Sequence, residues 1–391
     1  MTDFQKCIIA LVCAAVTGKP AVLLSDFDWE RALKFAKKHS IIPLIYYGAM
    51  HSGTEIPEGV AKHMELATYN SVSVDQNQLY CINKLVDAFK ADSIDFVLLK
   101  GAVIKPLYKK TEMRTMGDAD ILIKTEQYER IVPIMNRLGY LPGVESNHEY
   151  VWDKKNMLHV ELHKMLIPSY NKDYDAYFGD GWRLAKKYDG SEFKMSDEDT
   201  FVYIFTHFAK HYRDAGIGIR HITDIYVYLK AKPGLDMQYI KRELKKLQLL
   251  QFFTNVVQTL NVWFENGTET ESTKHITRFI FESGVYGTYD KSVISEAVKQ
   301  TEGHSVNGGK FKLFISNVFP SFKRMSSKYS FLNKFPFLLP VFWVTRWFSL
   351  LFARGERRSQ IGRKRTTVTR ESVENYRNEL KLAGLRFNFK E

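Results

Sequence analysis

Two short apolar stretches bordered by charged residues constrain the fold of this chain more than any other feature. The first covers residues 96–99 and the second residues 118–123. Side chains alternate between the two faces of a strand, so Asp118 and Asp120 share one face of the second stretch. Two carboxylates this close favour a divalent cation between them. The alternative is a solvated turn ahead of a buried strand, which is the more common origin of an isolated pair of this kind.

A third stretch with strict alternation, residues 157–165, forms a predicted hairpin with residues 150–153. His159, Glu161 and His163 fall on one face of it. If this strand lies beside the one with the two aspartates, Glu161 becomes a third acidic ligand, because three carboxylates on neighbouring strands can hold two divalent ions. Taken alone, the stretch favours an amphipathic hairpin with a solvated face.

Helical periodicity dominates the other parts of the chain up to about residue 300. Before the first strand it covers residues 4–16, 29–39, 41–50 and 60–91. In the last of these helices, apolar side chains at helical spacing predict one buried face, with Leu66, Tyr69, Leu79, Ile82, Val86 and Phe89. After the second strand, Thr125 is expected to cap a helix that Gly139 ends.

Two pairs of polar residues have a spacing of four on predicted helices. His207 and His211 could ligate zinc, but no glutamate follows the first histidine as metalloprotease chemistry needs, so packed or hydrogen-bonded imidazoles are favoured. They lie in a helix that Ser196 is expected to cap. Arg220 and Asp224 could form a pair on a helix surface, or a phosphate-facing arginine held by its carboxylate.

The positive charge of the chain is concentrated at its C-terminal end. From Lys310 to Glu391 there are 18 Lys and Arg against 5 Glu, a balance of +13, whereas residues 1–309 carry −1. A basic tail on a neutral body indicates an anionic partner for the tail, either a membrane surface or a nucleic acid, and argues against specific DNA binding by the protein. A solvated basic extension is the alternative.

An aromatic segment, residues 335–355, follows a predicted linker at residues 301–310. Pro340 suits the first turn of a helix there. The segment is too short and too interrupted to cross a bilayer, so it either lies in a membrane interface or docks in a groove of the protein. A cluster of basic residues follows it, with Arg354, Arg357, Arg358, Arg363, Lys364 and Arg365.

Length and cysteine content indicate a folded protein of a reducing compartment. A chain of 391 residues exceeds the usual size of a single core, so two or three modules are expected. The three cysteines, Cys7, Cys13 and Cys81, have no metal-like spacing and are expected to be free thiols. We expect a cytoplasmic protein, peripheral to the inner face of the membrane if the tail binds lipid.

Taken in order, these features resemble the uncharacterised nucleotidyltransferase family within the DNA polymerase beta-like nucleotidyltransferase superfamily. The resemblance rests on LLKG (Leu98 to Gly101), Tyr108, Arg114, GDADIL (Gly117 to Leu122), HVELH (His159 to His163), His207, His211, Arg220 and Asp224. The helices before the first strand and the aromatic segment are also similar to that family. The resemblance therefore spans the full length of the chain.

The resemblance implies an α+β fold, in which a small mixed β-sheet nucleotidyltransferase core is embedded in a mainly helical protein. It implies four regions: an N-terminal helical region (1–91), the nucleotidyltransferase core (92–170), a helical domain that completes the site (171–305), and a basic extension with an amphipathic aromatic helix (306–391).

It also implies a metal-dependent enzyme that moves an NMP from an NTP to a hydroxyl or phosphate acceptor and releases pyrophosphate. The catalytic residues and ligands of two Mg²⁺ or Mn²⁺ ions would be Asp118, Asp120 and Glu161. The residues that bind nucleotide phosphates would be Lys100, Gly101, Arg114 and Arg220. Supporting residues would be Tyr108, His159, His163, His207, His211 and Asp224.

The chain departs from the superfamily pattern in two places. Lys100 and Gly101 stand where Gly-Gly or Gly-Ser is usual, and the third acid is Glu161 in place of the more frequent Asp. Lys100 could supply positive charge to the phosphates, while Gly101 lets backbone amides approach them. The longer Glu161 side chain could reach the same metal.

Two other functions fit parts of the sequence. A DxD glycosyltransferase would hold the diphosphate of a sugar nucleotide with the same aspartates, but such enzymes do not place about ninety helical residues before their first strand. A catalytically silent nucleotide-binding or membrane-peripheral interaction protein would explain the basic aromatic tail, although all three acids are retained. The acceptor and the preferred base stay open.

Overall fold

The computed structural model of the chain describes residues 1–155, 157–285, 334–351 and 369–386, with short pieces between residues 287 and 332. The chain divides into two compact units. Residues 1–211 and 217–286 form the first unit, and residues 212–216 and 287–391 the second. The first unit contains every predicted site residue. The expected linker at residues 301–310 lies outside the described residues.

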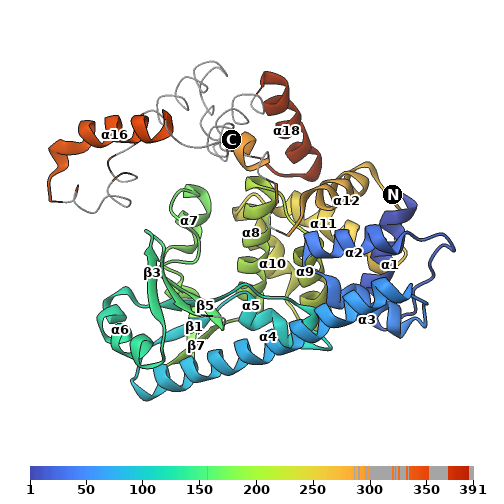
Figure 1. The fold of residues 1–391 in the computed structure, drawn as a ribbon, viewed down its shortest axis with the longest axis horizontal. Helices are drawn as coiled ribbons and strands as arrows, with labels where there is room; N and C mark the ends of the chain where they lie inside the picture. Colours follow the sequence, from blue (N-terminus) through green and yellow to red (C-terminus); the bar gives the residue numbers. More distant parts are fainter. Residues whose placement is uncertain are drawn as a thin grey trace. The chain divides into compact units, whose positions relative to one another are not determined.

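Four helices precede the first strand, as the periodicity predicts (Figure 1). They are α1 (Asp3–Thr17), α2 (Trp29–His39), α3 (Ile42–His51) and α4 (Glu58–Ala91). A capping box of Thr2 and Gln5 starts α1, and Gly18 ends it with a φ of 83°. All three cysteines are free, as expected.

The long helix α4 does not bury the single face that the sequence predicts. Leu66 and Tyr69 are 61% and 64% exposed, whereas Ile82 and Phe89 are buried in the core of the sheet domain. The first half of α4 contacts α2 and α3, and the second half passes under the sheet (Figure 1). Because the two halves pack against different partners, one helical stripe cannot be buried along the whole length.

Seven strands form one mixed sheet in the order β3-β4-β5-β2-β1-β7-β6. They are β1 (Phe96–Leu98), β2 (Asp118–Ile123), β3 (Leu141–Glu145), β4 (Glu149–Lys154), β5 (Leu158–His163), β6 (Ala185–Asp189) and β7 (Glu192–Met195). The predicted hairpin is present as antiparallel β4 and β5, and β5 runs parallel to β2. A mixed sheet within a mainly helical chain confirms the expected α+β class.

The two faces of this sheet differ in chemistry. On one face, Ile121, Ile123 and Val160 are buried under α4 and α6 (Tyr128–Arg137). Each fully buried aliphatic side chain of this kind contributes about 1.5–3 kcal/mol to stability. A register slip of one residue would turn these side chains to the other face. Their burial therefore fixes the direction of the acidic side chains of β2 and β5, which point to the opposite face.

The helix α6 begins later than predicted. Thr125 does not cap it, because residues Thr125–Gln127 first form a 3₁₀ turn and Gln127 occupies the cap position without a side-chain bond. The side-chain oxygen of Gln127 instead accepts a hydrogen bond from the backbone N–H of Asp95 at 2.9 Å. Gly139 follows the end of α6 with a φ of 80°, as expected for a terminating glycine.

Short helices join the strands, and longer ones follow the sheet. The short ones are α5 (Gly101–Ile104), the 3₁₀ turns Lys105–Leu107 and Thr111–Met113, and α7 (Lys172–Phe178). The later helices are α8 (Asp197–Asp214), α9 (Ile219–Ala231), α10 (Met237–Lys246), α11 (Leu250–Phe264) and α12 (Glu271–Ser283). Ser196 caps α8 as predicted, since its hydroxyl accepts the backbone N–H of Asp199 at 3.0 Å.

The second unit contains α16 (Leu339–Leu351) and α18 (Arg370–Ala383). Pro340 lies in the first turn of α16, as predicted, and the indole of Trp343 donates to the carbonyl of Pro320 at 2.9 Å. The basic cluster at residues 354–365 lies outside the described residues. Across the described part of the chain, no helix is both long and apolar enough to span a bilayer. A membrane role for the tail stays a prediction.

Candidate active site

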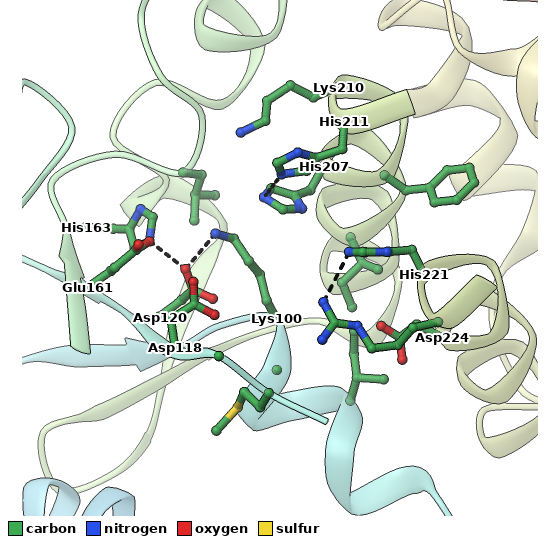
Figure 2. Close-up of a pocket in the computed structure, with 18 of the residues that line it drawn as sticks. Lys100, Asp118, Asp120, Glu161, His163, His207, Lys210, His211, His221 and Asp224 are labelled. Atoms are coloured by element: carbon green, nitrogen blue, oxygen red, sulfur yellow. Dashed lines mark hydrogen bonds and ion pairs between the residues drawn. The ribbon is translucent and has the colours of Figure 1, made fainter. Parts of the chain in front are cut away.

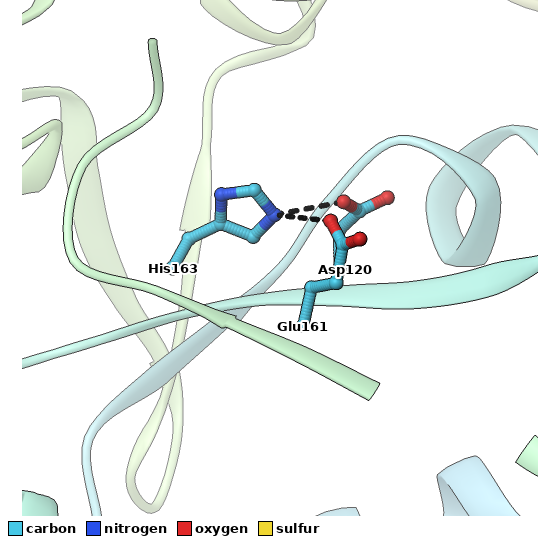
Figure 3. A group of neighbouring side chains, drawn as sticks. All are labelled: Asp120, Glu161 and His163. Carbon is cyan, nitrogen blue, oxygen red and sulfur yellow. Dashed lines mark hydrogen bonds and ion pairs between the residues drawn. The ribbon is translucent and has the colours of Figure 1, made fainter. Parts of the chain in front are cut away.

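Parallel pairing of β2 and β5 brings together polar side chains that are distant in the sequence. Asp118 pairs with His159, and Asp120 pairs with Glu161. Paired residues of neighbouring strands point to the same side of a sheet. Nε2 of His163 lies 2.8 Å from Oδ1 of Asp120 and 3.4 Å from Oε2 of Glu161 (Figure 3). The strand arrangement that Glu161 needs to join the aspartates is therefore present.

The cluster has the donor atoms of a divalent metal site. Asp120, Glu161 and His163 each offer one ligand atom, and these atoms lie within 4.8 Å of one another. Asp118 lines the same cavity (Figure 2). Carboxylate oxygens suit Mg²⁺ and Mn²⁺, and an imidazole nitrogen is compatible with Mn²⁺ and other transition metals. These residues fit a divalent cation. The sequence predicted only a supporting role for His163, whereas the structure places it among the possible ligands.

Lys100 is held against the cluster by an unusual backbone conformation. It lies between β1 and α5 with a φ of 41°, a region that L-residues rarely adopt. Its Nζ is 2.6 Å from Oδ1 of Asp120, and its side chain is 16% exposed. Burial lowers the pKa of Lys100, but the charge and hydrogen bond of Asp120, together with Tyr203 and Asp118, outweigh burial and raise it above the ordinary value. A charged lysine therefore occupies the centre of the site.

The surroundings shift the pKa values of the two aspartates of β2 in opposite directions. Burial raises the pKa of Asp118, and the charges of Asp120 and Glu161 add to the increase. Burial also acts on Asp120, but the Lys100 ammonium and the hydrogen bond from His163 outweigh it and hold the pKa of Asp120 well below its usual range. Asp120 is thus ionised and paired. Asp118 bears repulsion that a bound cation would relieve.

Gly101 allows the segment before β2 to approach the chain closely beside Lys100. A Cβ atom at this position would lie 2.6 Å from Sδ of Met116 and 3.0 Å from Nη1 of Arg114. Carbon atoms do not approach other heavy atoms this closely without displacement, so a larger residue would push Met116 or Arg114 away. The position favours glycine for space and not for backbone conformation, since its φ is not in the left-handed region.

Arg114 is anchored by a buried carboxylate from α9. Its Nε and Nη2 donate to the two oxygens of Asp224 at 3.0 and 3.1 Å. The hydroxyl of Tyr108 donates to Oδ1 of Asp224 at 2.7 Å. Arg114, Tyr108 and Asp224 are all nearly inaccessible to solvent. This network ties the segment between β1 and β2 to α9 at the edge of the cavity.

One interpretation of the sequence was that Arg220 and Asp224 pair on a helix surface, and this interpretation is wrong. Both residues are buried, and Asp224 holds Arg114. The Nη1 of Arg220 donates to the backbone carbonyl of Thr115 at 2.7 Å. A spacing of four residues on a helix brings side chains near each other, but a partner from a distant segment competes for the same carboxylate.

Three imidazoles line the opposite side of the cavity. Nε2 of His207 lies 3.1 Å from Nε2 of His211, so the pair shares a hydrogen bond. His221 lies next along, with its ring centre 6.4 Å from that of His211. Burial holds the pKa of all three well below the ordinary value, and the nearby charges of Lys100, Lys210 and Arg220 add to the effect. These imidazoles are neutral at neutral pH.

These groups surround one cavity of about 390 Å³ in the first unit. Eleven predicted residues line it: Lys100, Gly101, Arg114, Asp118, Asp120, Glu161, His163, His207, His211, Arg220 and Asp224. Two others lie beside them. Tyr108 supports Asp224, and His159 lies 2.6 Å from Asp153 and 3.7 Å from Glu161.

The structure adds cavity residues that the sequence did not single out. His148, Glu149, Lys210 and His221 line the cavity. Glu149 pairs with His163 in the β4–β5 hairpin, which places a fourth carboxylate near the cluster. Lys210 shares a helix face with His207, a relationship visible as a spacing of three. Spacings of this kind can be found in the sequence, but only the tertiary structure shows which helix faces and strand ends meet.

Comparison with known proteins places this chain in a family. The family described as uncharacterised nucleotidyltransferase matches residues 25–265. The solution structure of the antibiotic-resistance factor ANT(2'')-Ia is similar at 13% identity and a TM-score of 0.33, over 48% of this chain and 97% of that chain. No protein of curated function matches the chain. The matched range contains every predicted site residue, and the resemblance seen in the sequence is confirmed over residues 25–265: the chain belongs to the family of uncharacterised nucleotidyltransferases.

Proposed function

We propose that this chain transfers a nucleoside monophosphate from an NTP to an acceptor and releases pyrophosphate, with Asp118, Asp120 and Glu161 as its catalytic carboxylates. The observation that carries the proposal is the register of β2 and β5. It sets Glu161 beside Asp120 on the face that lines the cavity. Membership of a nucleotidyltransferase family supplies the reaction class.

The three carboxylates would hold Mg²⁺ or Mn²⁺, and their number is suited to two ions. Bound divalent ions neutralise phosphate charge and lower the pKa of an acceptor hydroxyl. His163 positions the carboxylates. Burial and Lys100 lower its pKa, but its bonds to Asp120 and Glu161 outweigh them and raise it above the ordinary value. Without a bound metal, the imidazole therefore acts as a hydrogen-bond donor to these carboxylates.

In the reaction, an acceptor oxygen forms a bond to the α-phosphorus of the NTP. The bond from that phosphorus to the oxygen bridging to the β-phosphorus breaks, and pyrophosphate leaves with the electron pair. We assign the acceptor proton to Glu161, whose side chain is 20% exposed against 4% for Asp120. A more exposed carboxylate passes the proton on to solvent more readily.

Cationic side chains position the triphosphate. Lys100 can exchange its contact with Asp120 for a phosphate oxygen, which keeps its charge compensated throughout. Arg114 presents Nη1 beside Gly101 while Asp224 holds its other nitrogens. Arg220 lines the same cavity from α9. Positioning and charge neutralisation of this kind supply most of the rate enhancement in phosphoryl transfer.

Calorimetry tests the proposal directly. ATP, CTP, GTP and UTP are titrated into the protein with Mg²⁺ or Mn²⁺, and pyrophosphate release is followed with labelled NTPs. At least one nucleotide should bind in a metal-dependent way. Asp118→Asn and Asp120→Asn should each lose binding by a factor of about 10 or more, since each removes a charged ligand. Asp26→Asn, an exposed loop substitution, is the matched control.

Other outcomes would support the competing functions. UDP release from a UDP-sugar without pyrophosphate release from any NTP would favour a glycosyltransferase. No binding of any of the four nucleotides with either metal would favour a silent interaction protein. Full activity in both aspartate variants would contradict the assigned roles.

A further inference from the structure

The cavity has two walls of opposite chemistry (Figure 2). The sheet contributes the carboxylates. The helices α8 and α9 contribute five nitrogen-bearing side chains, which we call the basic wall: His207, Lys210, His211, Arg220 and His221. A site that bound only a metal and its nucleotide would need positive charge near the triphosphate. The basic wall contains further residues that are not assigned to the triphosphate.

The α8 part of this wall is a separate group. His207, Lys210 and His211 stand at spacings of three and four, so they share one face of α8. All three line the cavity, and the figure shows Lys210 and the two imidazoles above Lys100 (Figure 2). The residues proposed to bind the triphosphate come from elsewhere: Lys100 and Gly101 from the start of α5, Arg114 from the segment before β2, and Arg220 from α9.

Positively charged side chains act on the imidazoles of the α8 face. Burial is the main cause of the low pKa of His207 and His211, and the charges of Lys100 and Lys210 lower both pKa values further. A protonated imidazole is thus disfavoured where two ammonium groups already act. An oxyanion at this position would be stabilised by the Lys210 ammonium and by the one N–H of the neutral imidazole pair that is not used within the pair.

We propose that His207, Lys210 and His211 bind an oxyanion of the acceptor, so that the acceptor is a phosphate- or carboxylate-bearing molecule. The inference rests on the proposed function, because it gives a role to the α8 residues that the proposed triphosphate site does not use. A neutral sugar would gain little from this wall. The charges of Lys210 and Arg220 would disfavour an amine placed against this wall.

The test measures binding of a simple probe to the nucleotide-loaded protein. Inorganic phosphate, and acetate in a parallel arm, are titrated into the full chain saturated with Mg²⁺ and α,β-methylene-ATP. Phosphate should bind alongside the nucleotide. Lys210→Met and His211→Gln should weaken it about 10-fold or more, as expected for loss of a charge-assisted hydrogen bond, while nucleotide affinity changes less than about 3-fold. Tighter binding of acetate would assign a carboxylate.

Matched variants separate a specific site from general charge effects. Lys241→Met removes one charge from an exposed position on α10 and should leave phosphate binding unchanged. Methionine keeps most of the apolar stem of Lys210, and the melting temperature of each variant checks the fold. Phosphate affinity unaltered in Lys210→Met and His211→Gln would indicate an adventitious ion only and overturn the proposal.

Two further outcomes distinguish this inference from the proposed function. Competition between phosphate and the nucleotide analogue, or an equal loss of nucleotide affinity in Lys210→Met, would assign the α8 face to the triphosphate and overturn the acceptor site. Failure of the wild type to bind any nucleotide would instead refute the proposed function. Phosphate binding to the nucleotide-free protein, and its loss in the two variants, would then decide whether the wall binds oxyanions.

Discussion

The ammonium of Lys100 lies 2.6 Å from Oδ1 of Asp120, although the backbone of Lys100 has a φ of 41°. Such a conformation costs about 1–3 kcal/mol, so the surrounding contacts must hold it. One of them is the backbone N–H of Leu99, which donates to the carbonyl of Asp120 at 3.0 Å. The pair keeps Asp120 ionised and fixed in direction before any substrate binds, which is the preorganisation that charge-based catalysis needs.

Removing the charge of Asp118 and removing the charge of Asp120 should have different effects on the stability of the protein. Asp120→Ala leaves the buried Lys100 without its partner and should destabilise the protein by about 3–5 kcal/mol. Asp118→Asn removes a charge whose pKa is raised by burial and by its acidic neighbours, so metal-free protein should melt at the same temperature or higher. In EDTA, urea denaturation measures the loss in Asp120→Ala and thermal denaturation measures the melting temperature of Asp118→Asn.

A double variant provides the control for this ion pair. Lys100→Met combined with Asp120→Leu removes both charges and should recover much of the stability lost in Asp120→Ala, because apolar replacement of a buried pair is often neutral. Added Mg²⁺ should raise the melting temperature of the wild type but not of Asp118→Asn. Equal destabilisation by Asp118→Asn and Asp120→Ala would contradict the assigned electrostatics.

Gly101→Ala should impair the site more than the fold. The new Cβ would meet Met116 and Arg114, and adjustment of these flexible side chains should cost about 1–3 kcal/mol of stability. Displacement of Arg114 should weaken nucleotide binding. Met116→Ala in the same chain removes the closest atom and should restore part of both losses. A single Gly101→Ala variant with unchanged nucleotide affinity would show that the close approach has no role in binding.

Asp224 should be essential for stability. Asp224→Ala leaves the buried guanidinium of Arg114 and the hydroxyl of Tyr108 without their acceptor, so a loss of about 3–5 kcal/mol is expected. Tyr108→Phe removes one hydrogen bond and should cost only about 1 kcal/mol. Denaturant unfolding compares the two. Similar small losses in both variants would mean that Arg114 finds another partner.

His39 should make stability depend on pH. Its ring is buried against Phe35, and Nδ1 accepts the backbone N–H of Ile219 at 3.3 Å. Burial, helped by the charge of Lys38, lowers the pKa of His39 from 6.5 to about 4. Above pH 6.5 both folded and unfolded states are neutral at this residue. Between 6.5 and 4 only the unfolded chain binds the proton, which should remove up to about 3 kcal/mol of stability as pH falls.

Urea denaturation at pH 7.5 and pH 5 measures this effect in the wild type and in His39→Gln. The variant should show a flatter pH dependence, even if it is less stable at pH 7.5. Other buried histidines with lowered pKa act in the same direction in both proteins, so the difference isolates His39. Identical slopes would show that His39 is not responsible.

Local patterns were sufficient to predict much of this protein. The alternation of β2 and β5 places Asp118 and Asp120 on one face of a strand and Glu161 on one face of another, since side-chain direction follows from backbone geometry alone. Helix periodicity located α1 to α4 within two residues of their observed ends. The ordered motifs also predicted the nucleotidyltransferase family, because a motif order is a property of the sequence.

The tertiary structure decided which of these side chains meet. Parallel pairing of β2 with β5 sets Glu161 against Asp120, and the burial of apolar side chains on the far face fixes that register. Asp224 binds Arg114, a residue 110 positions away, although Arg220 lies four positions away. The sequence did not single out Lys210 as a site residue. Partners of this kind depend on long-range packing, which sets the distance between elements, and no local periodicity encodes that distance.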